Sequence, residues 1–140
     1  EKRYVVVETA RKLTPLGVDL LKAEFPLDTA NTDESAWAMA CAEVSSASVV
    51  PWILLSAAVD FEVFLRQVSV ACQAGASGIA VGRAVWKEAV VMSPKERDKF
   101  LHTTAQSRLM RLTSLCTALA KPWQDFYPRL QIDENWYARY

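Results

Sequence analysis

The sequence predicts an α/β fold in which short parallel strands alternate with helices. Three apolar segments have the length and composition of buried strands, namely residues 18–25, 50–55 and 79–81. A segment with helical spacing of its apolar residues follows each of them, and this alternation is typical of parallel βα units. Because all three strands are apolar throughout, we expect helices to cover both faces of the sheet.

The first part of the chain supplies two helices with a strand between them. Residues 2–14 carry apolar residues at helical spacing, and Gly17 follows where a helix ends. Residues 18–25 then form a strand that Pro26 closes. Residues 31–33 (Asn-Thr-Asp) offer an N-cap for the second helix. The apolar stripe of that helix comprises Trp37, Ala40, Cys41 and Val44.

The middle of the chain repeats the pattern twice. After the strand at 50–55, Asp60 caps a third helix, and residues 79–81 form a third short strand. Gly82 and Arg83 open a further short helix that ends near Val91. The buried face of the third helix comprises Phe61, Phe64, Leu65, Val68, Ala71 and Cys72.

The last part of the chain is predicted as a long helix and an aromatic segment. Ser93 and Glu96 form a capping box with Pro94 at the first helical position, and the helix runs to about Leu119. Its inward residues are predicted to be Leu101, Ala105, Leu109, Leu112, Cys116 and Leu119. Residues 122–140 carry six aromatic side chains, so we expect them to pack on the surface of the fold.

Three strands cannot close an eight-stranded barrel. Two arrangements remain open from the pattern: an open three-layer sheet, or the last three units of a (β/α)8 barrel followed by extra C-terminal helices. In the second, residues 1–91 are the βα units, and residues 92–140 pack on them. The chain does not begin with methionine, so we expect a fragment or a processed product.

Composition excludes several classes of function. The 16 basic and 16 acidic residues give a net charge of zero and form no basic block, so nucleic acid is not expected as a partner. No apolar run approaches the ~20 residues of a membrane span. Cys41, Cys72 and Cys116 fall in predicted helices without a CxxC motif, which indicates reduced, buried thiols in a cytoplasmic protein. With His102 as the single histidine, they offer no metal-ligand cluster.

Lys22 is the most informative candidate for chemistry. It lies in the apolar segment Leu20–Phe25, where a lysine would lose hydration, and burial favours its neutral amine. A neutral amine can attack a carbonyl carbon and form an imine. Strand alternation places Lys22 and Glu24 on one face. The alternatives are a buried Lys22–Glu24 ion pair, or a strand-edge lysine that points to solvent.

A second candidate site follows the other two strands. Ser56 follows the second strand, and Gly82 and Arg83 follow the third. Since ligands of parallel βα folds bind at the carboxyl ends of the strands, we expect these residues to meet there. Gly82 permits close approach of the backbone, and the new helix and Arg83 favour an anion. The alternative is a turn glycine beside a surface cation. We assign Trp86 to packing.

Three segments together resemble the DeoC/LacD-like Schiff-base aldolases, which include tagatose-1,6-bisphosphate aldolase and sulfofructose-phosphate aldolase. These are VDLLKAEFP (18–26), PWILLSAAVDFEVF (51–64) and AGASGIAVGRAVWKEAV (74–90). The resemblance is clear for residues 1–91 and loose for the C-terminal helices. It implies that the chain is the C-terminal part of a TIM (β/α)8 barrel, which would pair with the missing N-terminal half or form a homo-oligomer.

The resemblance also implies roles for individual residues. Lys22 would form the imine, and Glu24 would orient Lys22 or the substrate. Ser56, Gly82 and Arg83 would hold the phosphate or sulfonate end of the substrate. The expected reaction is cleavage of a phosphorylated ketose to dihydroxyacetone phosphate and an aldehyde, with no cofactor and no metal. The alternatives are an inactive fragment that needs a partner half, or a relative of deoxyribose-phosphate aldolase with the same imine chemistry.

One residue departs from the family pattern. Ala58 stands where these aldolases usually have glycine in the loop after the second strand. If this position takes a positive φ or lies close to the ligand, the Cβ of Ala58 would disturb the anion loop.

Overall fold

Three short parallel strands form the centre of the structure, in the order β1-β2-β3. The structure is a computed structural model that describes residues 1–128, 134, 135 and 138. The strands are β1 (Leu21–Glu24), β2 (Trp52–Leu55) and β3 (Gly78–Ala80). Helices and parallel strands alternate along the chain, which confirms the predicted α/β class.

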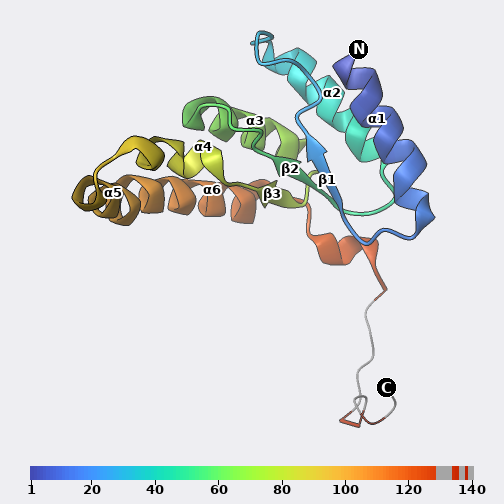
Figure 1. Ribbon diagram of the computed structural model, residues 1–140. Helices are drawn as coiled ribbons and strands as arrows, with labels where there is room; N and C mark the ends of the chain where they lie inside the picture. The colour runs from blue at the N-terminus through green and yellow to red at the C-terminus, as the bar shows by residue number, and fades with distance from the viewer. Residues whose placement is uncertain (129–133, 136–137, 139–140) are drawn as a thin grey trace.

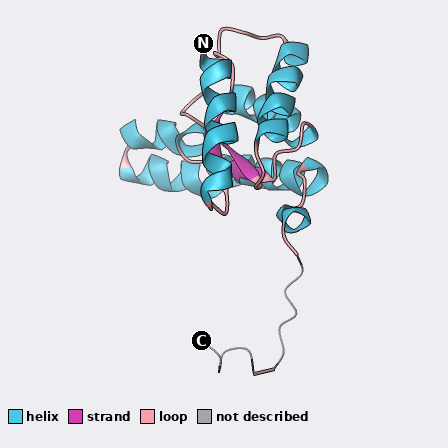
Figure 2. Cartoon of the chain, turned by 90° about the vertical axis from the view of Figure 1, so that its right-hand side faces the viewer, coloured by secondary structure: helices cyan, strands magenta, loops and turns pink. Residues whose placement is uncertain are grey.

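Helices make up most of the molecule, and the three short strands form only a small part of it (Figures 1 and 2). The α-helices are α1 (Lys2–Leu13), α2 (Glu34–Ala47), α3 (Phe61–Gln73), α4 (Arg83–Trp86), α5 (Pro94–Phe100) and α6 (Gln106–Leu119). Shorter turns of other helix types are η1 (Thr14–Leu16), η2 (Lys87–Val91), η3 (Leu101–Ala105) and η4 (Trp123–Phe126). Among the described residues, no helix combines the length and the apolar character that crossing a membrane requires.

The predicted helix ends are set by local hydrogen bonds. The Asp33 side chain accepts a hydrogen bond from the backbone N–H of Ser35 at 2.9 Å, as an N-cap residue does. Ser93 and Glu96 form the predicted capping box at the start of α5. Gly17 follows η1 with φ of 89°, a left-handed conformation that glycine adopts without a steric penalty.

One hydrophobic core joins the helices to one face of the sheet. Its largest fully buried side chains include Trp37 of α2, Trp52 and Leu54 of β2, and Phe64 of α3. Ala105 and Leu112 extend the same core to the C-terminal helices. The predicted apolar stripes of α2 and α3 are therefore the faces that these helices bury.

The two faces of the sheet differ in exposure. Ala23 and Leu54 lie on the helix-covered face and are 6% and 0% exposed. Lys22 and Glu24 alternate onto the opposite face and are exposed, and Ile53, the neighbour of Lys22 in β2, is only half-buried. The prediction that helices cover both faces is wrong for the described part of the chain. Right-handed crossovers between strands added in one direction place every connecting helix on the same side.

The strands are shorter than their apolar segments. β1 begins at Leu21, so residues 18–20 of the predicted strand lie outside it. Its pairing starts where the backbone N–H of Leu21 donates to the carbonyl oxygen of Pro51 at 3.0 Å. Proline has no N–H, so Pro51 cannot extend the ladder in the other direction. The third strand was predicted at 79–81 and lies one residue earlier, at Gly78–Ala80.

The predicted long C-terminal helix is interrupted by the π turn η3 between α5 and α6. Ala105 and Leu112 are buried as predicted. Leu101 and Leu109 are 42% and 46% exposed, so their assignment to the core is wrong. A π turn has more residues per turn than an α-helix, so it rotates the apolar stripe about the helix axis.

The aromatic segment after α6 contacts the fold only in part. Trp123 is 54% exposed, while the Tyr127 hydroxyl donates a hydrogen bond to the backbone oxygen of Asp19. The ammonium of Lys121 lies 4.3 Å from the ring centroid of Phe126. Packing of the segment is thus found around residues 121–127. The other predicted contacts, those of Trp136, Tyr137 and Tyr140, lie outside the described residues.

The three cysteines are free thiols, as predicted. Cys41 and Cys72 are buried, whereas Cys116 is only half-buried, which corrects its predicted burial. Burial raises the pKa of Cys41 to about 12. A hydrogen bond joins the thiols of Cys72 and Cys116. It raises the pKa of Cys72 and lowers the pKa of Cys116. Cys116 therefore has the most readily ionised thiol of the three.

We expect Cys116 to react first with a limiting amount of iodoacetamide at about pH 8, because alkylation requires the thiolate and access to solvent. Cys41 should react only after unfolding. Peptide mass spectrometry of samples quenched over time measures the order. Labelling of Cys41 in the folded chain as fast as that of Cys116 would contradict this prediction.

Candidate active site

A single cleft lies at the carboxyl ends of the strands and has a volume of about 580 Å³. It is bounded by the end of β1, the loop after β2 and the loop between β3 and α4. We call it the carboxyl-edge cleft, and its lining residues are Lys22, Glu24, Leu55, Ser56, Ala57, Ala58, Ala80, Val81, Gly82, Arg83 and Trp86. All five residues predicted to carry chemistry are among them, contributed by three consecutive βα units.

Lys22 lies on the open face of the sheet and is exposed, which corrects its predicted burial. In the register it is two residues before Glu24, the last residue of β1, and therefore ~7 Å deeper along the strand. None of the ion pairs found among the described residues includes Lys22. The buried Lys22–Glu24 ion pair is therefore not formed, and the amine has no carboxylate partner within the described chain.

Glu24 instead contacts Lys2 of α1. The Lys2 ammonium nitrogen lies 3.6 Å from the carboxylate of Glu24, and both side chains are partly exposed. A solvent-exposed pair of this kind adds little to stability. The contact does, however, place the amine of Lys2 beside the carboxyl-edge cleft, in addition to that of Lys22.

The loop after β2 has an unusual backbone. The backbone N–H of Ser56 donates to Ala80 at 3.2 Å, and that of Val59 donates back to Ser56 at 3.2 Å, which closes a tight turn. Within this turn Ala57 and Ala58 have φ of 47° and 60°. The Ala58 position therefore does take a positive φ. An L-residue there costs roughly 1–2 kcal/mol relative to a right-handed conformation.

We expect Ala58→Gly to stabilise the chain by roughly 0.5–1 kcal/mol, because glycine removes the Cβ strain and returns part of the gain as backbone entropy. Urea unfolding followed by circular dichroism measures the change. The matched control is Ala38→Gly on the exposed face of α2, which should lower stability by about 1 kcal/mol. A loss of stability in Ala58→Gly as large as that of the control would show that the loop is not strained.

Ser56, Gly82 and Arg83, the residues predicted to hold an anion, all line the carboxyl-edge cleft. Ser56 is 4% exposed, yet its hydroxyl makes no hydrogen bond within the described chain. A Cβ built on Gly82 would be in ordinary van der Waals contact with the indole nitrogen of Trp86, at 3.8 Å, without a clash. α4 is a single turn, so its dipole contributes little, contrary to the expected role of a helix end. The positive charge comes from Arg83.

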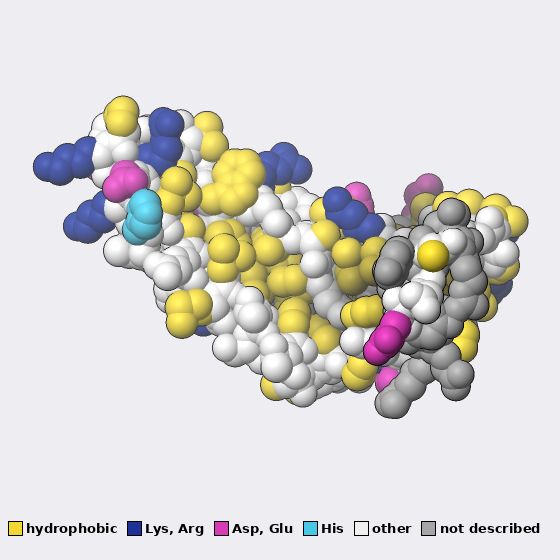
Figure 3. All heavy atoms as spheres, turned by 90° about the horizontal axis from the view of Figure 1, so that it is seen from below, with side chains coloured by type: hydrophobic (Ala, Val, Ile, Leu, Met, Phe, Trp, Pro, Cys, Tyr) yellow, Lys and Arg dark blue, Asp and Glu magenta, His cyan; other side chains and the backbone are white. Residues whose placement is uncertain are grey.

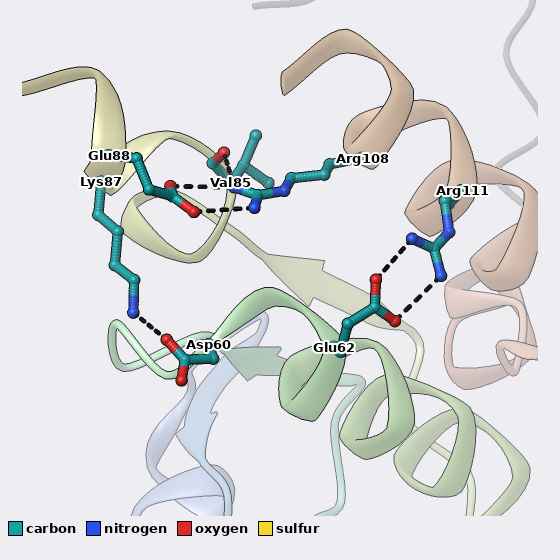
Figure 4. A network of polar contacts seen from close by, with 7 residues as sticks. All are labelled: Asp60, Glu62, Val85, Lys87, Glu88, Arg108 and Arg111. Atoms are coloured by element: carbon teal, nitrogen blue, oxygen red, sulfur yellow. Dashed lines mark hydrogen bonds and ion pairs between the residues drawn. The ribbon is translucent and has the colours of Figure 1, made fainter. Parts of the chain in front are cut away.

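A network of charged groups joins the walls of the cleft (Figure 4). Asp60 at the start of α3 pairs with Lys87, which directly follows α4. Arg108 of α6 donates two hydrogen bonds to Glu88, at 3.0 and 2.8 Å, and one to the backbone oxygen of Val85 at 2.8 Å. These hydrogen bonds lower the pKa of Glu88. α6 thus fixes the segment that carries Gly82 and Arg83.

A second contact of α6 reaches α3 directly. Arg111 donates hydrogen bonds to both carboxylate oxygens of Glu62, at 2.8 and 3.1 Å (Figure 4). Arg108 and Arg111 also lie over the ring of Phe61, each 5.0 Å from its centroid. The C-terminal helix is therefore bound both to α3 and to the segment that follows β3.

A larger groove of about 970 Å³ runs between α3 and α6, away from the strand ends. Its lining is mainly apolar and hydroxyl-bearing, and its two cations, Arg66 and Arg111, are paired with Glu34 and Glu62. No lysine lines it. The chemically equipped cleft is therefore the smaller one, at the edge where parallel α/β folds bind ligands.

Comparison with known proteins identifies the family of the chain. Residues 2–88 match the family described as DeoC/LacD family aldolase, which covers more than half of the chain and all the residues that line the carboxyl-edge cleft. The chain belongs to the DeoC/LacD aldolases.

Members of this family that the chain resembles include tagatose 1,6-diphosphate aldolases. The chain is 28% identical over 135 residues to tagatose 1,6-diphosphate aldolase 2 of Enterococcus faecalis, a match that covers 92% of this chain and 40% of the relative. It is 31% identical over 128 residues to the tagatose 1,6-diphosphate aldolase of Listeria monocytogenes, with 79% and 38% covered. The chain therefore spans about two fifths of the length of these aldolases.

Sequence reasoning missed Trp86, which lines the carboxyl-edge cleft, and Lys2, which lies beside it. Trp86 was assigned to packing, yet it lines the cleft. The sequence did contain a signal, because Trp86 lies one helical turn after Gly82 and Arg83. A helical side chain points back toward the N-terminus, and so toward the residues one turn earlier. Lys2 gave no usable signal, since only the fold brings the start of α1 beside the end of β1.

Proposed function

We propose that the chain carries part of the active site of a class I aldolase, in which Lys22 forms an imine with a phosphorylated ketose. The observation that supports this most is the single cleft that Lys22 shares with Ser56, Gly82 and Arg83. A nucleophilic amine and an anion-binding group belong to one reaction only if one substrate can reach both. Here the amine and the anion-binding residues come from three βα units whose strands end at the same edge of the sheet.

The proposed reaction needs an amine that is not held in an ion pair. The Lys22 nitrogen attacks the ketone carbon, and water leaves to give the protonated imine. The bond between the first and the second carbon beyond the imine carbon then breaks. The hydroxyl on the second carbon loses its proton and becomes the aldehyde carbonyl, while the electron pair of the broken bond moves into the imine and gives an enamine. A proton adds to the enamine carbon, and water releases dihydroxyacetone phosphate and free Lys22. The absence of an ion pair at Lys22 in the described chain is consistent with this role.

The anionic end of the substrate would bind on the opposite side of the cleft. The Arg83 guanidinium supplies charge and a planar set of donors, and Ser56 supplies a hydroxyl that has no partner within the described chain. Glu24, held near Lys2, would orient Lys22 or the substrate. The names of the relatives support tagatose 1,6-bisphosphate as the substrate. A sulfonate in place of the phosphate would meet the same donors.

We further propose that the three βα units are part of a (β/α)8 barrel whose other units complete the cleft. The exposed sheet face would then be the barrel interior, and β1 and β3 would pair with further strands through their free edges. The face seen from below, with hydrophobic side chains across its middle, is consistent with a covered surface (Figure 3). Such an enzyme would act in the cytoplasm, where free thiols persist.

The test uses the complete protein, meaning this chain together with the barrel units proposed to precede it. Triose phosphate released from tagatose 1,6-bisphosphate is measured in a coupled assay, with and without a chelator, and with deoxyribose 5-phosphate as the competing substrate. We expect cleavage of the tagatose ester at an unchanged rate in the chelator. Loss of activity in the chelator would contradict the imine mechanism, and cleavage of deoxyribose 5-phosphate alone would contradict the substrate.

The open face and free strand edges also favour a second candidate, a non-catalytic half that binds another chain. Both the catalytic barrel and the non-catalytic half require a partner, whereas a self-sufficient domain does not. Sedimentation of the chain distinguishes these two cases. We expect association, or tight binding to the missing half, because exposed strand edges and apolar faces bind other chains. A well-folded monomer of 15.6 kDa with no affinity for the other half would contradict both barrel proposals.

A further inference from the structure

Trp86 contributes its indole to the wall of the carboxyl-edge cleft. It is 41% exposed, whereas Trp37 and Trp52 are each 1% exposed. The atom nearest to a Cβ built on Gly82 would be the indole nitrogen of Trp86, at 3.8 Å. The N–H edge of the ring, rather than its hydrocarbon edge, therefore lies beside Gly82.

The buried tryptophans use their indole N–H groups within the fold. The Trp37 nitrogen donates to the backbone oxygen of Asn31 at 2.9 Å, and the Trp52 nitrogen donates to the Ser45 hydroxyl at 2.9 Å. The Trp86 nitrogen has no acceptor within the described part of the chain. An indole N–H is a donor only, so its partner must be an acceptor that enters the cleft.

Trp86 also borders a second cavity of the fold. It lines this apolar cavity of about 480 Å³ together with Ala89, Val90, Arg97 and Leu101. Arg97 ties this region together, because its guanidinium donates to the backbone oxygens of Ala89 and Met92, each at 3.1 Å. Trp86 therefore separates an apolar cavity from a polar cleft, which suits a side chain with one apolar body and one polar edge.

We propose that the indole N–H of Trp86 donates a hydrogen bond to an oxygen of the substrate phosphate held at Gly82 and Arg83. This rests on the proposed function of the cleft. Arg83 supplies charge that attracts any anion, whereas Trp86 supplies a neutral donor in a fixed direction, which needs an acceptor oxygen at one position. The pair would thus select both the charge of the ligand and the position of one of its oxygens.

The test is a titration of the ¹⁵N-labelled chain with inorganic phosphate at constant ionic strength, followed by NMR. The Trp86 indole signal is assigned from its loss in Trp86→Phe. We expect it to shift saturably, with the same midpoint as the backbone amides of Gly82 and Arg83. Movement of those amides without the Trp86 indole would overturn this proposal and leave the anion site intact. If none of them moves, the anion site fails and the proposal fails with it.

A matched pair of variants separates the hydrogen bond from packing. Trp86→Phe keeps an aromatic ring against the apolar cavity and removes the N–H, so the phosphate midpoint should rise about threefold to tenfold. Trp123→Phe changes a tryptophan of similar exposure outside the cleft and should leave the midpoint unchanged. Equal midpoints in Trp86→Phe and Trp123→Phe would overturn the proposal.

Discussion

Replacement of Lys22 by alanine or arginine is expected to reduce aldol cleavage by the complete protein roughly 10³-fold or more, since loss of a covalent nucleophile removes the whole catalysed route. Lys22→Arg is the more informative variant. It keeps the positive charge, but a guanidinium is always protonated and forms no imine. A steady-state assay with tagatose 1,6-bisphosphate measures kcat, and loss in both variants is the predicted result.

The control for this pair is Lys95→Ala on the exposed face of α5, which removes the same charge far from the cleft. We expect this variant to retain full activity. Circular dichroism shows whether the Lys22 variants fold, and they should, because Lys22 is exposed and makes no ion pair within the described chain. Folded Lys22→Arg protein with unchanged kcat would remove Lys22 from the mechanism.

The second large effect is expected at Arg83. Arg83→Gln removes the guanidinium that is proposed to bind the phosphate. The charged hydrogen bonds lost with it contribute about 1.5–3 kcal/mol to substrate binding, so KM should rise roughly tenfold to a hundredfold. The effect on kcat should be smaller, because the phosphate is distant from the bond that breaks. The measurement is the separate dependence of kcat and KM on the concentration of tagatose 1,6-bisphosphate.

Arg83→Lys refines this expectation. Lysine restores the charge without the planar donor set, so KM should recover only in part. Arg66→Gln serves as the control, because Arg66 is a cation of the distant groove between α3 and α6. If Arg83→Gln and Arg66→Gln gave the same KM, the anion would bind elsewhere.

Local signals in the sequence predicted most of the fold correctly. The caps at Asp33 and Ser93 depend on hydrogen bonds within a few residues, so the short sequence around each contains all that is needed. Features that depend on distant contacts were missed. β1 is short because its partner strand begins after Pro51, and Leu101 and Leu109 are exposed because a π turn rotates their helix.

That the candidate residues lie together could be predicted, whereas their surroundings could not. Lys22, Ser56 and Arg83 line one cleft because parallel strands bring their carboxyl ends to one edge, a rule that needs only the order of the elements. Whether Lys22 is buried depends on what covers the other face of the sheet, which periodicity does not specify. The indole of Trp86 was missed because its direction depends on the single turn of α4.

The central claim is the imine at Lys22. The most direct measurement is reduction with borohydride in the presence of dihydroxyacetone phosphate, carried out on the complete protein and followed by peptide mass spectrometry. We predict one adduct, on the peptide that contains Lys22, and none in Lys22→Arg. An adduct on Lys2 or Lys87 instead, or no adduct on folded protein, would contradict the account.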